Sequence, residues 1–489
     1  MLLALDQGTT SCRAVLFSAS GEVLDVRQRP LRQHFPQPGW VEHDPVEIRD
    51  AQLAVAEEVV REATRAVQAI GVTNQRETTV VWDRRTGKPV HRAIVWQDRR
   101  TAPMCARLAD DGLGSHVRRT TGLRLDPYFS GTKLAWILEH VPGARERAGA
   151  GDLLFGTVDS WLVWWMTGGP GGGRHVTDVT NASRTMLWDL RRGRWDPTLL
   201  GALDIPPEAL PEVVPSAGRV GEWNGVAITG LAGDQHAALF GQGATASGDA
   251  KCTLGTGGFL LMNTGGEPVA SPSGLLTTAA WDLGDHAAGD ARGPQFALEG
   301  SVFVAGAAVQ WLRDGLGVIE RSEDVEPLAR SVPDAGGVVF VPALAGLGAP
   351  HWDAGARGAV FGLTRGTTRA HLARATLDAL AHQTSDVVEA MERDAGLGVD
   401  RLRIDGGAAA NDLLMQLHAD LLGVPVERAA NVEATAWGAA LFAAVGAGLL
   451  SPSDVTPPAP QAVFTPALAP GERAERRGLW RDAVRRVRS

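Results

Sequence analysis

Short apolar runs alternate with amphipathic stretches along the chain. In the first half, the apolar runs flank polar turns, and a helical pattern follows Pro45 within residues 41–67. The strands that we expect there are residues 1–5, 13–17, 67–72 and 79–82. Strands that alternate with helices predict an α/β fold.

The second half repeats the opening pattern. A segment of small residues, Gly241–Gly248, is typical of a domain junction, and a second strand–turn–strand follows at 249–261. Each half therefore has a hairpin whose turn is rich in Gly and Thr, which suggests a duplication with a cleft between the halves. The other expected elements are helices at 302–314 and 368–395, a strand–turn–helix at 401–422, and a solvated terminal helix at 472–488. The expected domains are residues 1–243 and 249–450, followed by a C-terminal tail and helix at 451–489.

Composition narrows the class of protein. The chain has 489 residues with 44% hydrophobic and 21% charged residues, which is ordinary for a soluble globular protein of at least two domains. The net charge of -9 argues against binding to nucleic acid or anionic lipid. Three cysteines without a C-x-x-C motif fit a reducing compartment, so we expect a cytoplasmic protein. No apolar stretch is long enough for a membrane span, and we expect no membrane insertion.

The two Gly/Thr turns carry the first candidate chemistry. In the first, Asp6–Ser11, a carboxylate at a strand end precedes a glycine and three hydroxyl residues. Glycine lets backbone N–H groups approach phosphate closely, and Asp6 can hold Mg²⁺ through its waters. Either turn alone fits an ordinary hairpin, whereas the pair, with Leu254–Gly258 as the second, favours phosphate binding. The chain has no Walker-type G-x-x-x-x-G-K-[ST] sequence.

Polar and aromatic residues in other turns indicate an acceptor site. Arg76 and Glu77 are adjacent, so both can face one ligand only if the chain turns there. They then form either a cage for hydroxyl groups or a surface ion pair. Tyr128, the single tyrosine, and Trp96 are either ligand contacts or packed aromatic residues.

Two helix starts complete the set of candidates. Asp234 is either a helix cap or a general base that accepts a hydroxyl proton. The glycines of Asp405–Asn411 lie between an apolar strand and a helix, where they either admit a flat ligand or form a simple turn.

As a set, these segments resemble the FGGY carbohydrate kinase family, in order and without a large gap from residue 1 to about residue 450. The matching stretches include DQGTTS at Asp6–Ser11, GVTNQRETT at Gly71–Thr79, DPYFSGTKLAWIL at Asp126–Leu138, TDVTNASRTML at Thr177–Leu187, GLAGDQ at Gly230–Gln235, GTGGF at Gly255–Phe259, AGAAVQWLRD at Ala305–Asp314 and DGGAAAN at Asp405–Asn411. The NQRETT and DPYFSGTK pieces resemble the members that phosphorylate glycerol rather than sugars.

The resemblance implies two actin-like, ribonuclease-H-like ATPase domains with the active site in the cleft between them. It implies that ATP contacts Thr9, Thr10, Ser11, Arg13, Thr256, Gly306, Gln310, Gly407 and Asn411. It implies that glycerol contacts Arg76, Glu77, Tyr128, Asp234, Gln235 and Thr9, with Trp96 and Phe259 as apolar walls. Asp234 would be the general base rather than a helix cap, and Asp6 and Asp234 would be the candidate ligands for Mg²⁺.

The implied activity is ATP-dependent phosphorylation of glycerol to sn-glycerol 3-phosphate, in glycerol uptake and catabolism. We expect a homo-oligomer, a dimer or a tetramer. A related kinase for another polyol or a pentulose remains an alternative, as does an actin-like ATPase without a small-molecule acceptor. Two surface segments are also expected: a long polar loop at Trp281–Gly293 and a turn at Ser216–Gly225.

Overall fold

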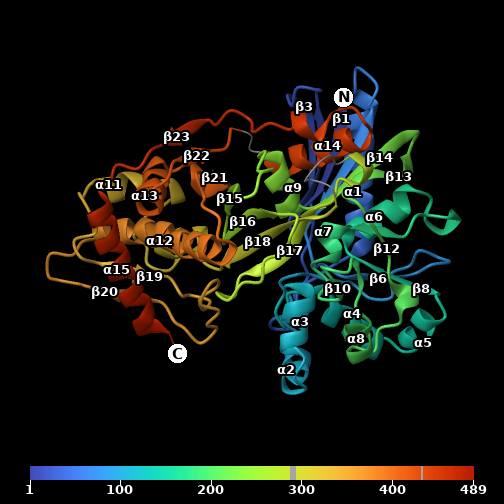
Figure 1. The fold of residues 1–489 in the computed structure, drawn as a ribbon, viewed down its shortest axis with the longest axis horizontal. Helices are drawn as coiled ribbons and strands as arrows, with labels where there is room; N and C mark the ends of the chain where they lie inside the picture. Colours follow the sequence, from blue (N-terminus) through green and yellow to red (C-terminus); the bar gives the residue numbers. More distant parts are fainter. Residues whose placement is uncertain (287–292, 431–432, 489) are drawn as a thin grey trace.

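The computed structural model describes residues 1–286, 293–430 and 433–488. Two bodies lie side by side, each built around one large sheet (Figure 1). In the first sheet the strands lie in the order β13-β14-β5-β1-β2-β3. They are β1 (Leu2–Gln7), β2 (Ser11–Phe17), β3 (Val23–Pro30), β5 (Ala69–Asn74), β13 (Ala217–Trp223) and β14 (Val226–Gly233).

The second sheet has the order β17-β18-β16-β15-β21-β22-β23. Its strands are β15 (Ala250–Leu254), β16 (Gly258–Gly265), β17 (Leu276–Trp281), β18 (Gln295–Val302), β21 (Leu402–Asp405), β22 (Val426–Arg428) and β23 (Ala462–Phe464). In both sheets an antiparallel hairpin pairs with an antiparallel third strand on one side and with parallel strands on the other. The two bodies therefore share one strand plan, and the predicted α/β fold of two actin-like domains is confirmed.

Helices cover the sheets. In the first body α1 (Pro45–Glu62) packs on β2 and β3, with Asp44 as N-cap and Pro45 in its first turn. In the second body α12 (Arg369–Ala395) packs against α13 (Asp412–Leu422). The further helices are α2 (Ala102–Asp110), α3 (Gly114–Thr121), α4 (Ser130–His140), α5 (Ala144–Gly149), α6 (Val158–Met166), α7 (Val179–Ala182), α8 (Pro197–Ala202), α9 (Asp234–Gly241), α10 (Gly306–Asp314), α11 (Val325–Arg330), α14 (Ala434–Gly446) and α15 (Pro470–Val487). Within the described part of the chain, no helix has both the length and the apolarity needed to cross a bilayer.

In the described parts of the chain, five two-stranded sheets lie outside the large ones. They pair β4 (Glu42–His43) with β7 (Ala93–Ile94), β6 (Val80–Asp83) with β8 (Leu153–Gly156), β9 (Val176–Asp178) with β12 (Glu212–Val214), β10 (Trp188–Asp189) with β11 (Arg194–Trp195), and β19 (Val339–Val341) with β20 (Ala359–Phe361). The helices α2–α5 and α8 gather around a separate apolar cluster at the lower end of the first body (Figure 1). That cluster includes Phe129 and so fixes the segment that carries Tyr128.

Helix α14 comes from the second half of the sequence but packs on β1, β5 and β14 of the first sheet (Figure 1). Its contact is close because both surfaces are built from small residues. A Cβ on Gly71 would lie 2.0 Å from the carbonyl oxygen of Ala439, and one on Gly438 would lie 1.8 Å from that of Ala237. A larger side chain at Gly71 would therefore force α14 away from the sheet, and one at Gly438 would force it away from α9.

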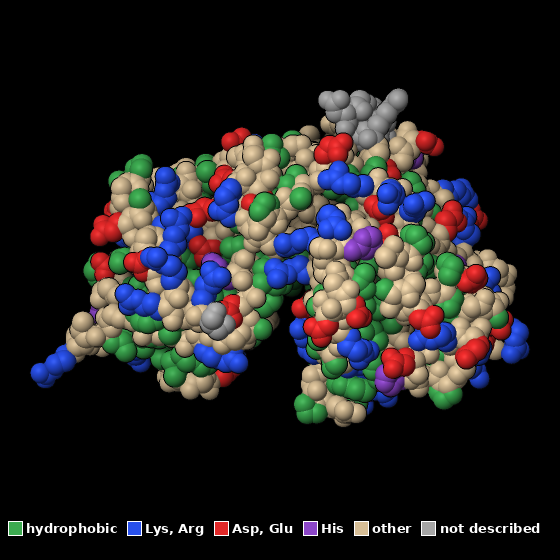
Figure 2. Space-filling view, turned by 60° about the horizontal axis from the view of Figure 1, so that its bottom comes forward, with side chains coloured by type: hydrophobic (Ala, Val, Ile, Leu, Met, Phe, Trp, Pro, Cys, Tyr) green, Lys and Arg blue, Asp and Glu red, His purple; other side chains and the backbone are tan. Residues whose placement is uncertain are grey.

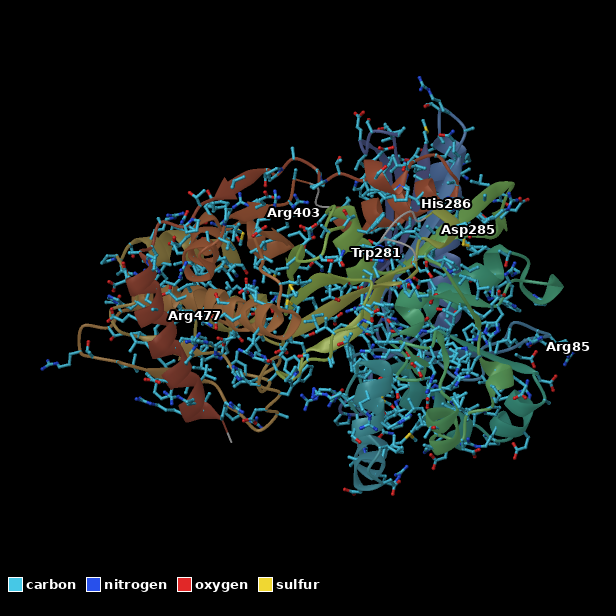
Figure 3. All side chains as sticks on the ribbon, viewed as in Figure 1. Arg85, Trp281, Asp285, His286, Arg403 and Arg477 are labelled. Atoms are coloured by element: carbon cyan, nitrogen blue, oxygen red, sulfur yellow. The ribbon has the colours of Figure 1, made fainter. Side chains whose placement is uncertain are left out.

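Several expected boundaries are wrong. The helix expected from Val302 begins at Gly306, because β18 continues to Val302. Residues 217–223 form strand β13 rather than a surface turn, because they pair with β14. Trp281 is buried against Phe240 near the middle of the molecule (Figure 3), so the Trp281–Gly293 segment does not begin on the surface. Residues 287–292 of that segment lie outside the described residues.

The terminal helix is also more buried than the sequence suggests. Arg477 and Trp480 of α15 are buried, and Arg477 donates to Asp386 of α12 at 2.5 Å. Trp480 donates to the same carboxylate at 2.7 Å. Helix α15 is thus part of the second body rather than a solvated appendage (Figure 3).

Candidate active site

The first hairpin turn joins β1 to β2. The Gly8 N–H donates to the Ser11 carbonyl at 2.9 Å and closes the turn. The Thr9 hydroxyl accepts a hydrogen bond of 3.0 Å from the indole N–H of Trp96. Thr10, at the tip, is exposed, whereas Arg13 pairs with Asp6 across the hairpin and with Glu433 at 2.6 Å. This turn therefore presents hydroxyl and N–H groups beside the paired charges of Arg13, Asp6 and Glu433.

The second hairpin turn lies at the mouth of a cavity of about 440 Å³. The Gly306 N–H donates to the Gly255 carbonyl at 2.9 Å, so the turn rests on the start of α10. Five residues predicted to contact nucleotide line this one cavity: Thr256, Gly306, Gln310, Gly407 and Asn411. Thr9, Thr10, Ser11 and Arg13 do not line it and belong to the first turn. The predicted nucleotide residues thus form two groups, one on each hairpin.

The start of α13 lies in the same cavity and is already capped. The Asn411 side chain accepts from the Leu414 N–H at 2.8 Å, and Glu326 accepts from the N–H groups of Asp412 and Leu413. A carboxylate at a helix start occupies the position that an anion would otherwise take. This end of the cavity therefore suits an uncharged part of a ligand better than a phosphate group.

A buried charge network joins the two bodies at the candidate acceptor site. Glu299, from β18 of the second body, accepts from Arg76 at 2.5 and 3.2 Å and from Arg184 at 3.0 Å. Arg184 also donates to Glu77 at 2.6 Å. Burial alone would raise the pKa of Glu299, but Arg184 and Arg76 outweigh it and hold the pKa at about 2. Glu299 is therefore ionised at neutral pH and paired with both arginines.

Backbone conformation explains how Arg76 and Glu77 share this network. The strand β5 ends at Asn74, and Glu77 has a φ of 61°, in the left-handed region that non-glycine residues seldom adopt. The chain thus turns between the two side chains, as a shared ligand requires. Such a conformation costs on the order of 1–3 kcal/mol and persists only where its surroundings hold it, here through Arg184.

Aromatic residues form a wall beside these charges. Trp96 lies edge-on to Tyr128, with ring centroids 5.7 Å apart, and to Phe259 of the second body at 6.4 Å. The buried ammonium of Lys133 donates to the backbone carbonyl groups of Tyr128 and Phe129 and so fixes the tyrosine segment. Burial raises the pKa of Tyr128, which keeps its hydroxyl protonated and able to donate.

Asp234 opens α9 directly after β14, beside Arg76. The Arg76 Nε atom lies 3.2 Å from the carboxylate, whose side chain remains 31% exposed. Burial raises the pKa of Asp234 to about 6, while Arg76 acts in the opposite direction. Gly233, rather than Asp234, is the N-cap of α9. The Asp234 side chain accepts from the Gln235 N–H of the first turn at 2.6 Å, and its raised pKa suits a general base that works near neutral pH.

Gln235 follows on the same helix and contacts the second body. Its side-chain oxygen accepts from the Lys251 ammonium, which also donates to the Thr253 hydroxyl at 2.9 Å. Lys251 is fully buried on β15.

Asp6 and Asp234, the predicted ligands for Mg²⁺, lie at the ends of two strands of the first sheet. Within residues 1–286, 293–430 and 433–488, no three His, Cys, Asp or Glu side chains come together as a metal site. Strand β5 lies between β1 and β14, so the backbones of these two strands are roughly 10 Å apart. The assignment of the two carboxylates to Mg²⁺ stays a prediction.

Sequence reasoning missed Arg184, Glu299, Lys133 and Lys251. The signal for Glu299 was a single carboxylate inside the apolar strand 295–302, since a charge there needs a buried partner. The signal for Lys133 and Lys251 was the rarity of lysine, because only three lysines occur among 47 basic residues. Arg184 lies in a stretch that the family resemblance includes, but nothing in its spacing identifies its partners.

Comparison with known proteins places this geometry in a family. Residues 1–241 match the N-terminal domain of the FGGY family of carbohydrate kinases, and residues 250–447 match its C-terminal domain. A protein named glycerol kinase from Alkalilimnicola ehrlichii is 57% identical, over 99% of this chain and 98% of that protein. One from Halorhodospira halophila is 56% identical, over 99% and 96%. The crystal structure of Plasmodium falciparum glycerol kinase with ADP superposes with a TM-score of 0.93 and 32% identity, over 99% and 97%. The chain belongs to the FGGY family of carbohydrate kinases.

Proposed function

We propose that the protein transfers the γ-phosphoryl group of Mg·ATP to a terminal hydroxyl of glycerol, forming sn-glycerol 3-phosphate for glycerol uptake and catabolism. The names of its full-length relatives and the ADP in the similar crystal structure support this assignment.

The acceptor cage is the observation that carries the proposal. It comprises the paired charges of Arg76 and Glu77, the aromatic wall of Trp96 and Tyr128, and the carboxylate of Asp234. Alternating donors and acceptors suit hydroxyl groups, and an aromatic wall suits the carbon atoms between them. Arg76 and Glu77 are almost fully buried, which fits a small polyol.

Asp234 is the proposed base. As the glycerol oxygen forms its bond to the γ-phosphorus, the bond from that phosphorus to the bridging oxygen of ADP breaks, and the hydroxyl proton passes to the Asp234 carboxylate. Because the transition state of phosphoryl transfer is loose, the protein mainly positions the groups. Arg76 does so for Asp234 through its contact of 3.2 Å.

The nucleotide and its metal ion fit the donor side. Thr256, Gly306, Gln310, Gly407 and Asn411 would hold the nucleotide in the cavity, while Thr9, Thr10, Ser11 and Arg13 would meet phosphate oxygens. When bound, Mg²⁺ would neutralise charge on those oxygens. The buried carboxylate of Asp6 fits a contact through the water shell that Mg²⁺ retains, in keeping with its place at the first turn.

An assay of ADP release with and without glycerol tests the proposal. Glycerol should stimulate release, and 1,2- and 1,3-propanediol should be poor substitutes, because each leaves a buried polar group of the cage unpaired. A preference for xylulose or ribulose would reassign the chain to a related kinase. Release that no acceptor stimulates would indicate an ATPase.

We also propose that the protein works in the cytoplasm as a homo-oligomer, a dimer or a tetramer. Its three cysteines are free and buried, in keeping with a reducing compartment. The edge strand β3 exposes Val23, Leu24 and Val26, an apolar edge on which a second copy could pair. Light scattering after gel filtration measures the oligomeric state.

A further inference from the structure

We propose that Lys251 is a positioning residue that fixes the side-chain amide of Gln235, so that Gln235 offers its N–H₂ group, as a donor, to the acceptor substrate. This inference rests on the proposed function, because it assigns a direction to a hydrogen bond in the acceptor site.

The orientation follows from the contact between the two residues. The Lys251 ammonium has only donors, and it donates to the side-chain oxygen of Gln235. A flipped amide would place its N–H₂ group against that ammonium, donor against donor. The oxygen of Gln235 is therefore held on the side of the second body, and its nitrogen is the free end.

The surroundings of Lys251 keep it in place. Its side chain is fully buried, and a second hydrogen bond of 2.9 Å to Thr253, on the same strand, fixes the ammonium. Burial lowers the pKa of Lys251, while the carboxylates of Asp405 and Asp234 act in the opposite direction. A guanidinium would be larger and would bring five donors to a site with two identified acceptors, which favours a lysine here in a chain with few lysines.

The side-chain N–H₂ group of Gln235 is placed to donate to a substrate. It is only half-buried and follows Asp234 directly on α9. Asp234 would accept a proton from the attacking hydroxyl, and Gln235 would donate to an oxygen beside it. Asp234 thus supplies an acceptor and Gln235 a donor for the hydroxyl groups of a polyol.

Helix α9 offers a matched control at its other end. Arg403, on β21 of the second body, donates to the backbone carbonyl of Gln242 and pairs with Glu427 at 2.9 Å (Figure 3). Both cations thus link α9 to the second sheet, but Arg403 contacts backbone rather than a side chain of the acceptor site. Arg403→Met removes such a link without changing the orientation of Gln235.

Steady-state kinetics of five variants test the inference. Lys251→Met and Gln235→Glu should each lower kcat/KM for glycerol about tenfold, with the KM for ATP unchanged, because each removes an oriented donor. The double variant Lys251→Met/Gln235→Leu should be no worse than Gln235→Leu alone. Arg403→Met should lower the melting temperature but keep kcat/KM within twofold.

Gln235→Glu is the decisive variant, since it retains an acceptor for Lys251 and loses the N–H₂ group. Wild-type kcat/KM in this variant would overturn the inference, because the link to Lys251 alone would then suffice. Equal losses in Lys251→Met and Arg403→Met would also overturn it. The wild-type assay separates this failure from failure of the proposed function. If an acceptor other than glycerol stimulates ADP release, the same variants are measured with that acceptor. If no acceptor does, calorimetry compares glycerol binding by Gln235→Glu with glycerol binding by the wild type.

Discussion

The acceptor cage and the nucleotide cavity are built in opposite ways. The cage brings together charged side chains from both bodies, with Glu299 of the second holding Arg76 and Arg184 of the first. The cavity is lined by residues 254–414 alone, many of them glycine, alanine or small polar residues. Figure 2 shows the molecule hollowed between the two bodies, with basic side chains along the inner edge. The cavity is thus formed by one body, although the first hairpin turn would also meet the phosphates, whereas the cage is built from both bodies.

This difference predicts which changes matter most. A change in the cage acts on charges that are fully or mostly buried and should be severe. A change in the cavity acts on backbone contacts and helix caps and should be mild. The five predictions that follow test this contrast in order of decreasing effect.

Asp234→Asn should have the largest effect on catalysis. The variant keeps the size of the side chain but cannot accept the hydroxyl proton, so kcat should fall about 10²–10⁴-fold. Stopped-flow or coupled kinetics measure the loss, and calorimetry should find ADP affinity unchanged. Near-normal turnover would show that Asp234 is not the base.

Glu299→Gln should have the largest effect on stability. It leaves Arg76 and Arg184 buried with one fewer negative charge, and breaking such a network costs about 3–5 kcal/mol. Chemical denaturation measures the free energy of unfolding. Glu222→Gln is the control, since Glu222 pairs with Arg219 on the exposed surface, where a pair contributes about 0–1 kcal/mol. Equal losses in both variants would contradict the role of the network.

The pH dependence of the reaction should report the environment of Asp234. Burial raises its pKa to about 6, and the base must be ionised to accept a proton. Below that pH, kcat/KM should therefore fall tenfold for each unit of pH, and it should be level above it until another group titrates. Measurements from pH 5 to 8 check this. An acid limb near the usual aspartate pKa of about 4 would show that the carboxylate is better solvated than the structure indicates.

Trp96→Phe should weaken the coupling between nucleotide binding and glycerol binding. Its indole N–H holds Thr9 of the first phosphate turn, and its ring is part of the acceptor wall. We expect Mg·ADP to raise the affinity for glycerol, and loss of one such hydrogen bond should reduce that gain several-fold. Isothermal calorimetry with and without Mg·ADP measures that gain. Trp165→Phe is the control, because the Trp165 indole N–H has no hydrogen-bond partner among the described residues. The same change in both variants would refute the coupling.

Asn411→Ala should have the smallest effect. Loss of the α13 cap should cost about 1 kcal/mol of stability and raise the KM for ATP a few-fold, with the KM for glycerol unchanged. Asp196→Ala removes the corresponding cap of α8, outside the cavity, and should cost similar stability without changing the KM for ATP. An equal rise in both KM values for Asn411→Ala would show that the cavity and the cage are not separate.

Secondary-structure elements that depend on neighbouring residues could be predicted from local patterns in the sequence. The two Gly/Thr hairpins, helix α12 and the turn before α13 follow from glycine positions and apolar periodicity. The partners of Arg76 did not follow, because Glu299 lies 223 residues away and its position depends on how the two sheets meet. Likewise, residues 217–223 form a strand only because β14 pairs with them.

The docking of α14 bears on how the chain is made. This helix covers β1, β5 and β14 through alanine and glycine, yet it is synthesised some 200 residues after β14. Until residues 434–446 leave the ribosome, one face of the first sheet has no native cover. A fragment that ends at the junction after α9 would expose that apolar face permanently. The sequence of the first body matches one domain, but this body can complete its fold only after nearly the whole chain has been synthesised. A chaperone that shields this face during synthesis would therefore raise the yield of folded enzyme.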